Sequence, residues 1–148
     1  MSLKIVLKPG EKALIGGSMI VNGKRRCEFE VLNDVPVLRG SEVMAVEDAV
    51  TPCRRLYFAT MRLYAEPKLR GELLPVFSEA CGEVLSLGVE ALTKSVLDAS
   101  EDVASGRLYA ALRRFRGLVD IEREALSEEL SATAAAGRRR AGLLDSDA

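Results

Sequence analysis

The sequence predicts an α+β fold, in which a small antiparallel β-sheet at the N-terminus is followed by about four α-helices. Up to residue 46, short β-branched and aliphatic runs are separated by turn-forming pairs, and from residue 47 the apolar residues recur every three or four positions. Hydrophobic residues make up 48% of the 148 residues, which is enough to bury one core. We therefore expect a basic β region over residues 1–46, a helical region over 47–122, and a frayed helix with a disordered tail over 123–148.

Five short strands in one antiparallel sheet are expected in the β region. They cover residues 3–8, 12–15, 18–21, 24–32 and 35–38. Asn22-Gly23 stands between the third and fourth runs and predicts a β-hairpin, because both central residues of a type I′ turn need a positive φ. Pro36 in the last run indicates an edge strand, since proline cannot donate to a sheet.

Four helices are expected after the β region. They cover residues 51–66, 68–87, 89–103 and 108–119. Thr51 and Pro52 suit the N-cap and the first position of the first helix, and Pro67 ends it. Pro75 is expected to break or kink the second helix, and Gly106 fits the position just after the third.

The composition argues against several classes of catalyst. The chain has no histidine, which excludes a Ser-His-Asp triad and an imidazole metal ligand. Its three cysteines, Cys27, Cys53 and Cys81, are far apart and form no Cys-x-x-Cys pair, so they fit small core residues of a reduced protein. We therefore expect no enzyme, no catalytic residue, no metal and no cofactor.

The sequence also predicts the cellular compartment of the protein. No apolar run is long enough to span a membrane, and the N-terminus has no hydrophobic signal segment. We expect a cytoplasmic protein that does not enter a membrane.

Charge divides the chain at the same boundary as the secondary structure. Residues 1–40 hold seven Lys or Arg against four acidic residues, a net charge of +3, and the remainder holds fourteen against eighteen, a net charge of −4. A polyanion such as RNA is therefore expected to meet the sheet. The basic candidates are Lys4, Lys8, Lys24, Arg25, Arg26 and Arg39.

Several stretches resemble the FlbT family, which regulates flagellin synthesis in alphaproteobacteria. Leu-Lys-Pro-Gly-Glu-Lys at 7–12, Glu-Val-Leu-Asn-Asp-Val at 30–35 and Thr-Pro-Cys-Arg-Arg-Leu-Tyr-Phe at 51–58 are similar to its motifs, as are residues 106–112 and 118–122. Cys53 and Arg55 stand where the family has leucine and glutamine. The resemblance implies binding to the 5′ untranslated region of flagellin mRNA and promotion of its decay, together with the small flagellar protein FlaF. In some family members the effect on flagellin is positive.

The β region also resembles the fold of the carbon-storage-regulator (CsrA) family of RNA-binding proteins. Residues 10–16 are similar to its Gly-Glu-Thr-Leu-Met-Ile-Gly, and residues 35–39 to its last strand, Val-Ala-Val-His-Arg. The resemblance implies that Lys8 and Arg39 grip the RNA, although Leu38 stands where that family has histidine. In a CsrA-like arrangement the first and last strands meet at one edge, so Lys4 would join Lys8 and Arg39 in one basic strip.

Lys24, Arg25 and Arg26 follow the Asn-Gly pair; they are further RNA candidates or simply a charged, solvated turn. The sheet has too little core to stand alone, so we expect it to dock on the helices or to pair with a second copy in a homodimer, as CsrA-like dimers do.

The alternative function is a protein-interaction adaptor that acts on FlaF or on flagellin without touching RNA. Tyr57, Met61 and Tyr64 share a helical spacing and are the candidate partner-binding face, although the same spacing also fits a helix core.

Overall fold

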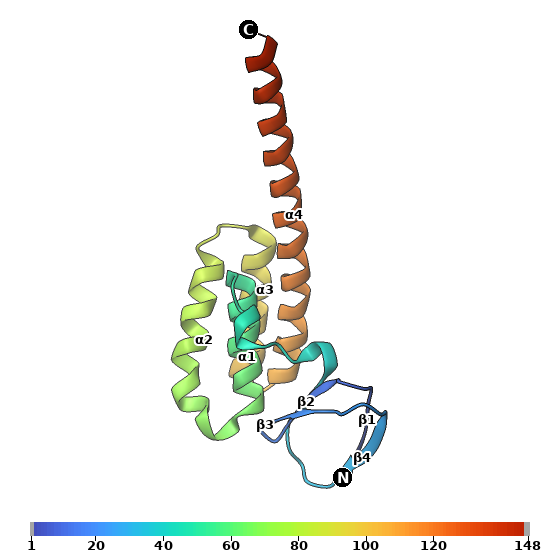
Figure 1. Ribbon diagram of the computed structural model, residues 1–148. Helices are drawn as coiled ribbons and strands as arrows, with labels where there is room; N and C mark the ends of the chain where they lie inside the picture. The colour runs from blue at the N-terminus through green and yellow to red at the C-terminus, as the bar shows by residue number, and fades with distance from the viewer. Residues whose placement is uncertain (1, 147–148) are drawn as a thin grey trace.

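The computed structural model describes residues 2–146 and has an α+β fold, as predicted. Five short strands come first: β1 (Leu3–Leu7), β2 (Lys12–Ile15), β3 (Ser18–Val21), β4 (Cys27–Val31) and β5 (Val37–Arg39). Four α-helices follow: α1 (Pro52–Ala65), α2 (Arg70–Leu85), α3 (Glu90–Ala104) and α4 (Leu108–Ser146). Three short 3-10 turns lie between them: η1 (Gly40–Glu42), η2 (Val46–Asp48) and η3 (Pro67–Leu69). Figure 1 shows the strands at one end of an upright helical bundle.

The strands form two antiparallel sheets, so the prediction of a single sheet is wrong. β1 pairs with β4, and the second sheet has the order β3-β2-β5. β1 and β5 therefore lie in different sheets, which corrects the expectation that Lys4, Lys8 and Arg39 line one shared edge. β5 is an edge strand, as Pro36 indicates.

The hairpin lies at Gly16-Gly17 rather than at Asn22-Gly23. Gly16 and Gly17 have φ values of 58° and 87°, which suit a two-residue turn between β2 and β3. Neither Asn22 nor Gly23 has a positive φ, and β3 does not pair with β4. Because β3 is already paired with β2, the Asn-Gly pair instead leads the chain across to the other sheet.

The β region docks on the helices through the second sheet. Leu14 of β2 and Leu38 of β5 are buried in the main core, together with residues from all four helices. Neighbouring Ala13 faces the other way, into a small cluster with Ile5 and Leu7 of β1. Of the two expected ways to complete the sheet's core, the structure shows docking on the helices.

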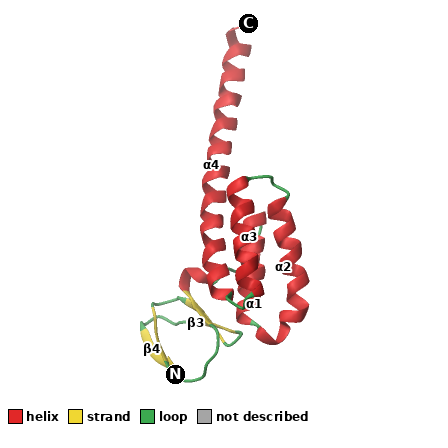
Figure 2. Cartoon of the chain, turned by 180° about the vertical axis from the view of Figure 1, so that it is seen from behind, coloured by secondary structure: helices red, strands yellow, loops and turns green. Residues whose placement is uncertain are grey.

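The helical bundle agrees with most sequence predictions. Thr51 caps α1, its Oγ1 accepting the Arg54 amide, and the helix ends before Pro67. α1 packs against α2 and α4, and α3 packs against both of these helices (Figure 2). Gly106 follows α3 with a φ of 81°, as the sequence predicts. α2 runs through Pro75 as one continuous helix, so the break expected at this proline is absent.

α4 differs most from the prediction. It continues as one helix to Ser146, where the sequence favours a frayed helix and a disordered tail from residue 123. Alanine, glutamate and arginine, which fill much of this segment, form helices well even without tertiary contacts. Residues 147–148 lie outside the described part of the chain. None of the helices in residues 2–146 combines the length and apolar character that a membrane span needs.

The reactivity of the three cysteines can test which of them are buried in this core. Cys53 and Cys81 are buried, and Cys27 is partly exposed. Burial raises the pKa of Cys53 to about 12, with the Glu122 carboxylate adding to the shift, and burial also raises the pKa of Cys81. Both thiols are therefore protonated at pH 8, and only the thiolate reacts.

We expect iodoacetamide at pH 8 to label Cys27 in the folded protein well before Cys53 or Cys81, with intact-mass spectrometry and peptide mapping as the measurement. In urea all three should react at similar rates. Rapid labelling of Cys53 in the folded protein would contradict its place in the core.

Candidate RNA-binding surface

Asn22 holds two loops of the β region together. Its side-chain Nδ2 donates to the carbonyl oxygens of Lys8 at 2.8 Å and Arg25 at 2.9 Å. Backbone bonds from the Gly10 amide to the Gly23 carbonyl and from the Asn22 amide to the Glu11 carbonyl add to this contact. The structure therefore brings the loop with Lys24 and Arg25 next to Lys8, although no strand pairing joins them.

Glu11 links the same place to the end of β5. Its Oε1 accepts the backbone amide of Lys8 at 3.2 Å. Its Oε2 lies so close to Gly40 that a Cβ added there would come within 2.9 Å of it, and Gly40 has a φ of 59°. Arg39 precedes Gly40 and is the register partner of Ala13. The Glu11 carboxylate therefore lies beside the backbone of Lys8 and of Gly40, the residue after Arg39, even though β1 and β5 do not pair.

Lys4 and Arg26 have a different setting. The Lys4 Nζ lies 3.7 Å from Glu28 and the Arg26 guanidinium lies 2.9 Å from the same carboxylate. Lys4 also stands opposite Glu30 in the β1–β4 register. This face is charged, but its positive charge is balanced by acid.

The remaining candidates define the basic surface: Lys8, Lys24, Arg25 and Arg39. All four are exposed, and within residues 2–146 none of them makes an ion pair. Positive groups without an acidic partner are available to phosphate oxygens.

Arg39 is positioned from the helical side by Glu42, which the sequence analysis did not single out. The Glu42 carboxylate accepts the Arg39 amide at 3.4 Å and the Tyr109 hydroxyl at 2.6 Å. The hydroxyl of Tyr57 donates to the Glu42 carbonyl at 2.6 Å. The bond to Glu42, together with partial burial, raises the pKa of Tyr109, so the tyrosine remains a donor at neutral pH. η1 is therefore fixed between β5, α1 and α4.

Two of the three residues expected to bind a partner lie inside the protein. Tyr57 and Met61 are 3% and 4% exposed and belong to the main core, which confirms the core interpretation of their spacing. A partner cannot reach them, so the expected face is corrected at these two positions. Tyr64 is half-buried, and its ring lies 5.7 Å from that of Tyr109.

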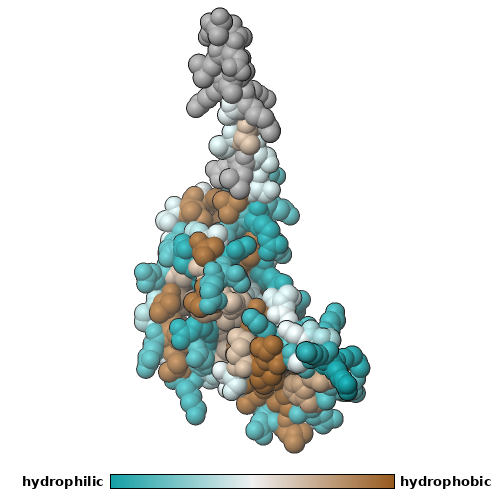
Figure 3. Space-filling model, in the orientation of Figure 1, coloured by the Kyte–Doolittle hydropathy of each residue, from teal (hydrophilic) through white to brown (hydrophobic). Residues whose placement is uncertain are grey.

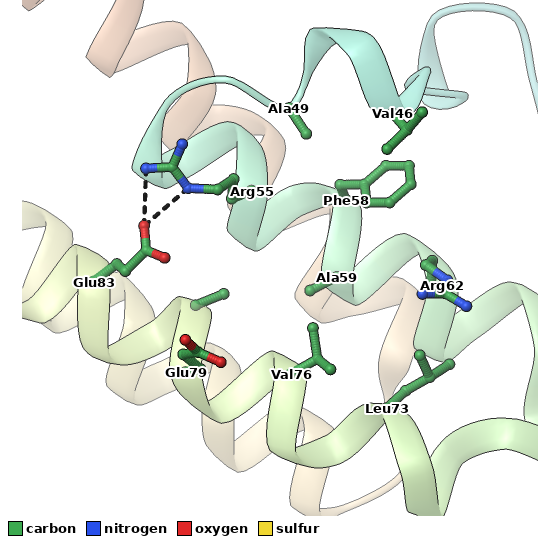
Figure 4. A pocket seen from close by; sticks show the side chains of 11 residues that line it. Val46, Ala49, Arg55, Phe58, Ala59, Arg62, Leu73, Val76, Glu79 and Glu83 are labelled. Atoms are coloured by element: carbon green, nitrogen blue, oxygen red, sulfur yellow. Dashed lines mark hydrogen bonds and ion pairs between the residues drawn. The ribbon is translucent and has the colours of Figure 1, made fainter.

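A groove between α1 and α2 offers a more accessible place for a protein partner (Figure 4). It encloses about 340 Å³, and Phe58, Ala59, Leu73 and Val76 are among the side chains that line it. Arg55 and Glu83 form an ion pair of 2.9 Å at one end, as Figure 4 shows. In residues 2–146, no three His, Cys, Asp or Glu side chains gather in a way that could hold a metal ion.

Comparisons with known proteins identify the same family over most of the chain. The family model described as "Flagellar protein FlbT" matches residues 3–126. A protein of Rhodopseudomonas palustris (strain TIE-1), named probable flagellum biosynthesis repressor protein FlbT, is 32% identical over 130 residues, which cover 86% of this chain and 99% of the relative. The flagellum biosynthesis repressor protein FlbT of Caulobacter vibrioides (strain ATCC 19089 / CIP 103742 / CB 15) is 30% identical over 138 residues, covering 93% and 98% of the two chains. No solved structure matches significantly.

Proposed function

The chain belongs to the FlbT family of flagellar proteins, and we propose that it represses flagellum biosynthesis by binding the 5′ untranslated region of flagellin mRNA and promoting its degradation. The names of its relatives support the repressing effect. The basic surface supports RNA as the target.

The observation that carries this proposal is that Asn22 and Glu11 hold together the backbone at Lys8, Arg25 and Gly40, the residue after Arg39. A single-stranded leader RNA presents phosphates and unstacked bases. The planar guanidinium of an arginine can form two parallel hydrogen bonds with phosphate or guanine, whereas lysine acts as a point charge on the backbone. The negative charge of the helical region would oppose non-specific wrapping, so binding is confined to the β end.

A second function, that of an adaptor for FlaF or flagellin, is favoured by the groove between α1 and α2. Apolar side chains such as Phe58 and Val76 line it, and Val76 is 48% exposed. In the first proposal FlaF binds at this groove while RNA binds at the β end. In the second, no RNA is bound at all.

Arg39→Ala should weaken binding to the flagellin leader RNA by about 1–3 kcal/mol, the range for loss of a specific contact. Lys8→Ala should weaken binding to all RNAs alike and reduce the slope of log affinity against log salt by about one. The measurement is a fluorescence anisotropy titration at two or more salt concentrations, with a scrambled RNA beside the leader.

Arg113→Ala is the matched control, because Arg113 is exposed on α4 and its loss changes the net charge equally. It should bind like the unmodified protein. If folded Arg39→Ala and Lys8→Ala also bind normally, the basic surface is not the site. If the unmodified protein does not prefer the leader over the scrambled RNA, the adaptor function takes precedence.

A further inference from the structure

The outer strand β3 presents one free edge. In the order β3-β2-β5 it pairs with β2 alone. Just beyond the strand, the Asn22 amide donates to the Glu11 carbonyl at 2.9 Å, so this pair is a hydrogen-bonded one. Hydrogen-bonded and non-hydrogen-bonded pairs alternate along an antiparallel ladder, so the amides and carbonyls of Met19 and Val21 point away from β2. Within residues 2–146, no backbone hydrogen bond outside the strand ladders uses these four groups.

The side chains of β3 are apolar and exposed. Met19, Ile20 and Val21 are 51%, 38% and 60% exposed, and the strand contains no charged residue and no proline. Edge strands of natural proteins are usually protected by a charge, a proline or a bulge. Figure 3 shows hydrophobic surface, in brown, where the strands meet the helices. β3 therefore has the character of a strand that another strand covers.

A hollow rich in methionine lies beside this edge. It encloses about 380 Å³ between the second sheet, η2 and α1, and Met19, Met44, Phe58 and Met61 are among the side chains that line it. Met19 lies opposite Leu14 of β2, which packs into the main core, so both side chains are on the face of the sheet that meets the helices. A strand added to β3 would place alternate side chains on this same face. Methionine side chains adapt readily to an apolar partner.

The two ends of β3 differ in charge. Glu47 and Glu66 line the hollow beside the first residues of the strand. Glu66 is paired with Arg62 at 2.9 Å. At the other end, the exposed Lys12 stands opposite Val21 in the register with β2. In residues 2–146 neither Glu47 nor Lys12 makes an ion pair, so β3 runs from an acidic end to a basic end.

From this polarity we infer that β3 pairs with β3 of a second copy of this chain, antiparallel and centred on Ile20. In this register Met19 of each copy lies opposite the partner's Val21, and all the outward amides and carbonyls find a partner. A shift by two residues in either direction would set one of these residues opposite Gly17 or Gly23, outside the strand.

Two features make a second copy the occupant. Opposite residues of an antiparallel pair share a face, so Val21 of each copy covers the hollow beside the partner's Met19. Lys12 is then two strand spacings, about 10 Å, from the partner's Met19, and its long side chain extends toward the partner's Glu47. This contact occurs twice by symmetry, whereas a parallel pair would set like charges together. The dimer is independent of the RNA proposal, because Lys12 is not part of the basic surface.

The test is sedimentation equilibrium of the full chain, whose monomer has a mass of 16.0 kDa. We expect a dimer of twice that mass. Met19→Pro removes an amide that points away from β2, so it should weaken dimerisation by about tenfold or more, because each dimer loses the bond twice, while the pairing with β2 is kept. Met19→Ala is the matched control: it keeps the amide and should weaken the dimer less.

Charge reversal tests the polarity of the pairing. Lys12→Glu and Glu47→Lys should each weaken dimerisation by about tenfold, because each sets like charges together at both ends of the contact. The double variant should recover most of the lost affinity. Lys94→Glu, at an exposed position of α3, changes the net charge as Lys12→Glu does and should dimerise normally.

Circular dichroism of each variant should show that the fold is kept, and the charge variants decide the question if Met19→Pro disturbs the sheet. A monomer at every concentration up to about 1 mM, a weak limit for a specific complex, would overturn the inference. A dimer that a folded Met19→Pro variant leaves intact would also overturn it, by placing the contact elsewhere. Charge variants that change nothing, or that are not rescued in the double variant, would rule out the antiparallel register.

Discussion

Phe115→Ala is expected to lower the free energy of unfolding by about 3–5 kcal/mol, the usual cost of emptying a fully buried phenylalanine site. Phe115 lies on α4 with 0% of its surface exposed. Its ring centroid is 6.2 Å from that of Phe77 on α2, in a tilted arrangement. Removing the ring would leave a cavity where several helices meet, and rigid helices can close it only in part. The loss is a large share of the 5–15 kcal/mol that typically stabilises a domain.

Urea denaturation followed by circular dichroism measures this change. Leu32→Ala serves as the control, because Leu32 is 73% exposed and its truncation should alter stability by no more than about 0.5 kcal/mol. Phe115→Leu should fall between the two variants, since leucine fills part of the site. If Phe115→Ala is no more destabilising than Leu32→Ala, the helices do not pack around this ring.

The helical half could be predicted closely because its signals are local. The Thr51-Pro52 pair marks the start of α1 in any context, since it supplies both an N-cap oxygen and a preset φ. The three-or-four spacing identifies the buried stripe of α3, where Leu92, Val96 and Ala99 all lie in the core. These features depend on residues within a turn or two of each other. The full extent of α4 could not be predicted, because the segment after residue 122 has too few core residues to indicate more than a frayed helix with a disordered tail.

The strand pairing could not be predicted in the same way, because it depends on partners far along the chain. The strands themselves are three to five residues long, so local pattern constrains their register only weakly. Asn-Gly is a stronger hairpin signal than Gly-Gly, so the sequence alone favours Asn22-Gly23 over Gly16-Gly17, where the hairpin lies. Docking of Leu14 and Leu38 on the helices selects the β2–β5 pair, which only the folded chain reveals.

At the candidate site, too, the residue types could be predicted from the sequence, but their positions in the fold could not. The sequence identifies Lys8 and Arg39 as basic positions, but only the structure shows that the Glu11 carboxylate lies beside the backbone of Lys8 and of Gly40, the residue after Arg39. Glu42 was missed altogether, because its role comes from a contact with Tyr109, 67 positions away. No short motif predicts a bond of that span.

Glu122→Ala should lower the free energy of unfolding by about 2–3 kcal/mol, because hydrogen bonds to a charged group contribute more than neutral ones. Glu122 lies on α4 but closes the N-terminus of α1. One carboxylate oxygen accepts the hydroxyl of Thr51, and the other accepts the backbone amide of Cys53 at 3.0 Å. Its negative charge also lies at the positive end of the α1 dipole. The same side chain thus caps one helix and fastens it to another.

Two further variants separate these contributions under urea denaturation. Glu122→Gln keeps the shape but removes the charge, so it should cost less, about 1 kcal/mol. Glu124→Ala, at an exposed position of the same helix, is the control and should be nearly neutral.

Because Thr51 and Glu122 share one hydrogen bond, the losses from Thr51→Ala and Glu122→Ala should not add in the double variant. Thr51 also caps the Arg54 amide, so the threonine variant retains a cost of its own when Glu122 is absent. Fully additive losses would mean that the two side chains act separately. In that case the hydrogen bond between Thr51 and Glu122 does not contribute to stability, and Glu122 acts on α1 through the Cys53 amide alone.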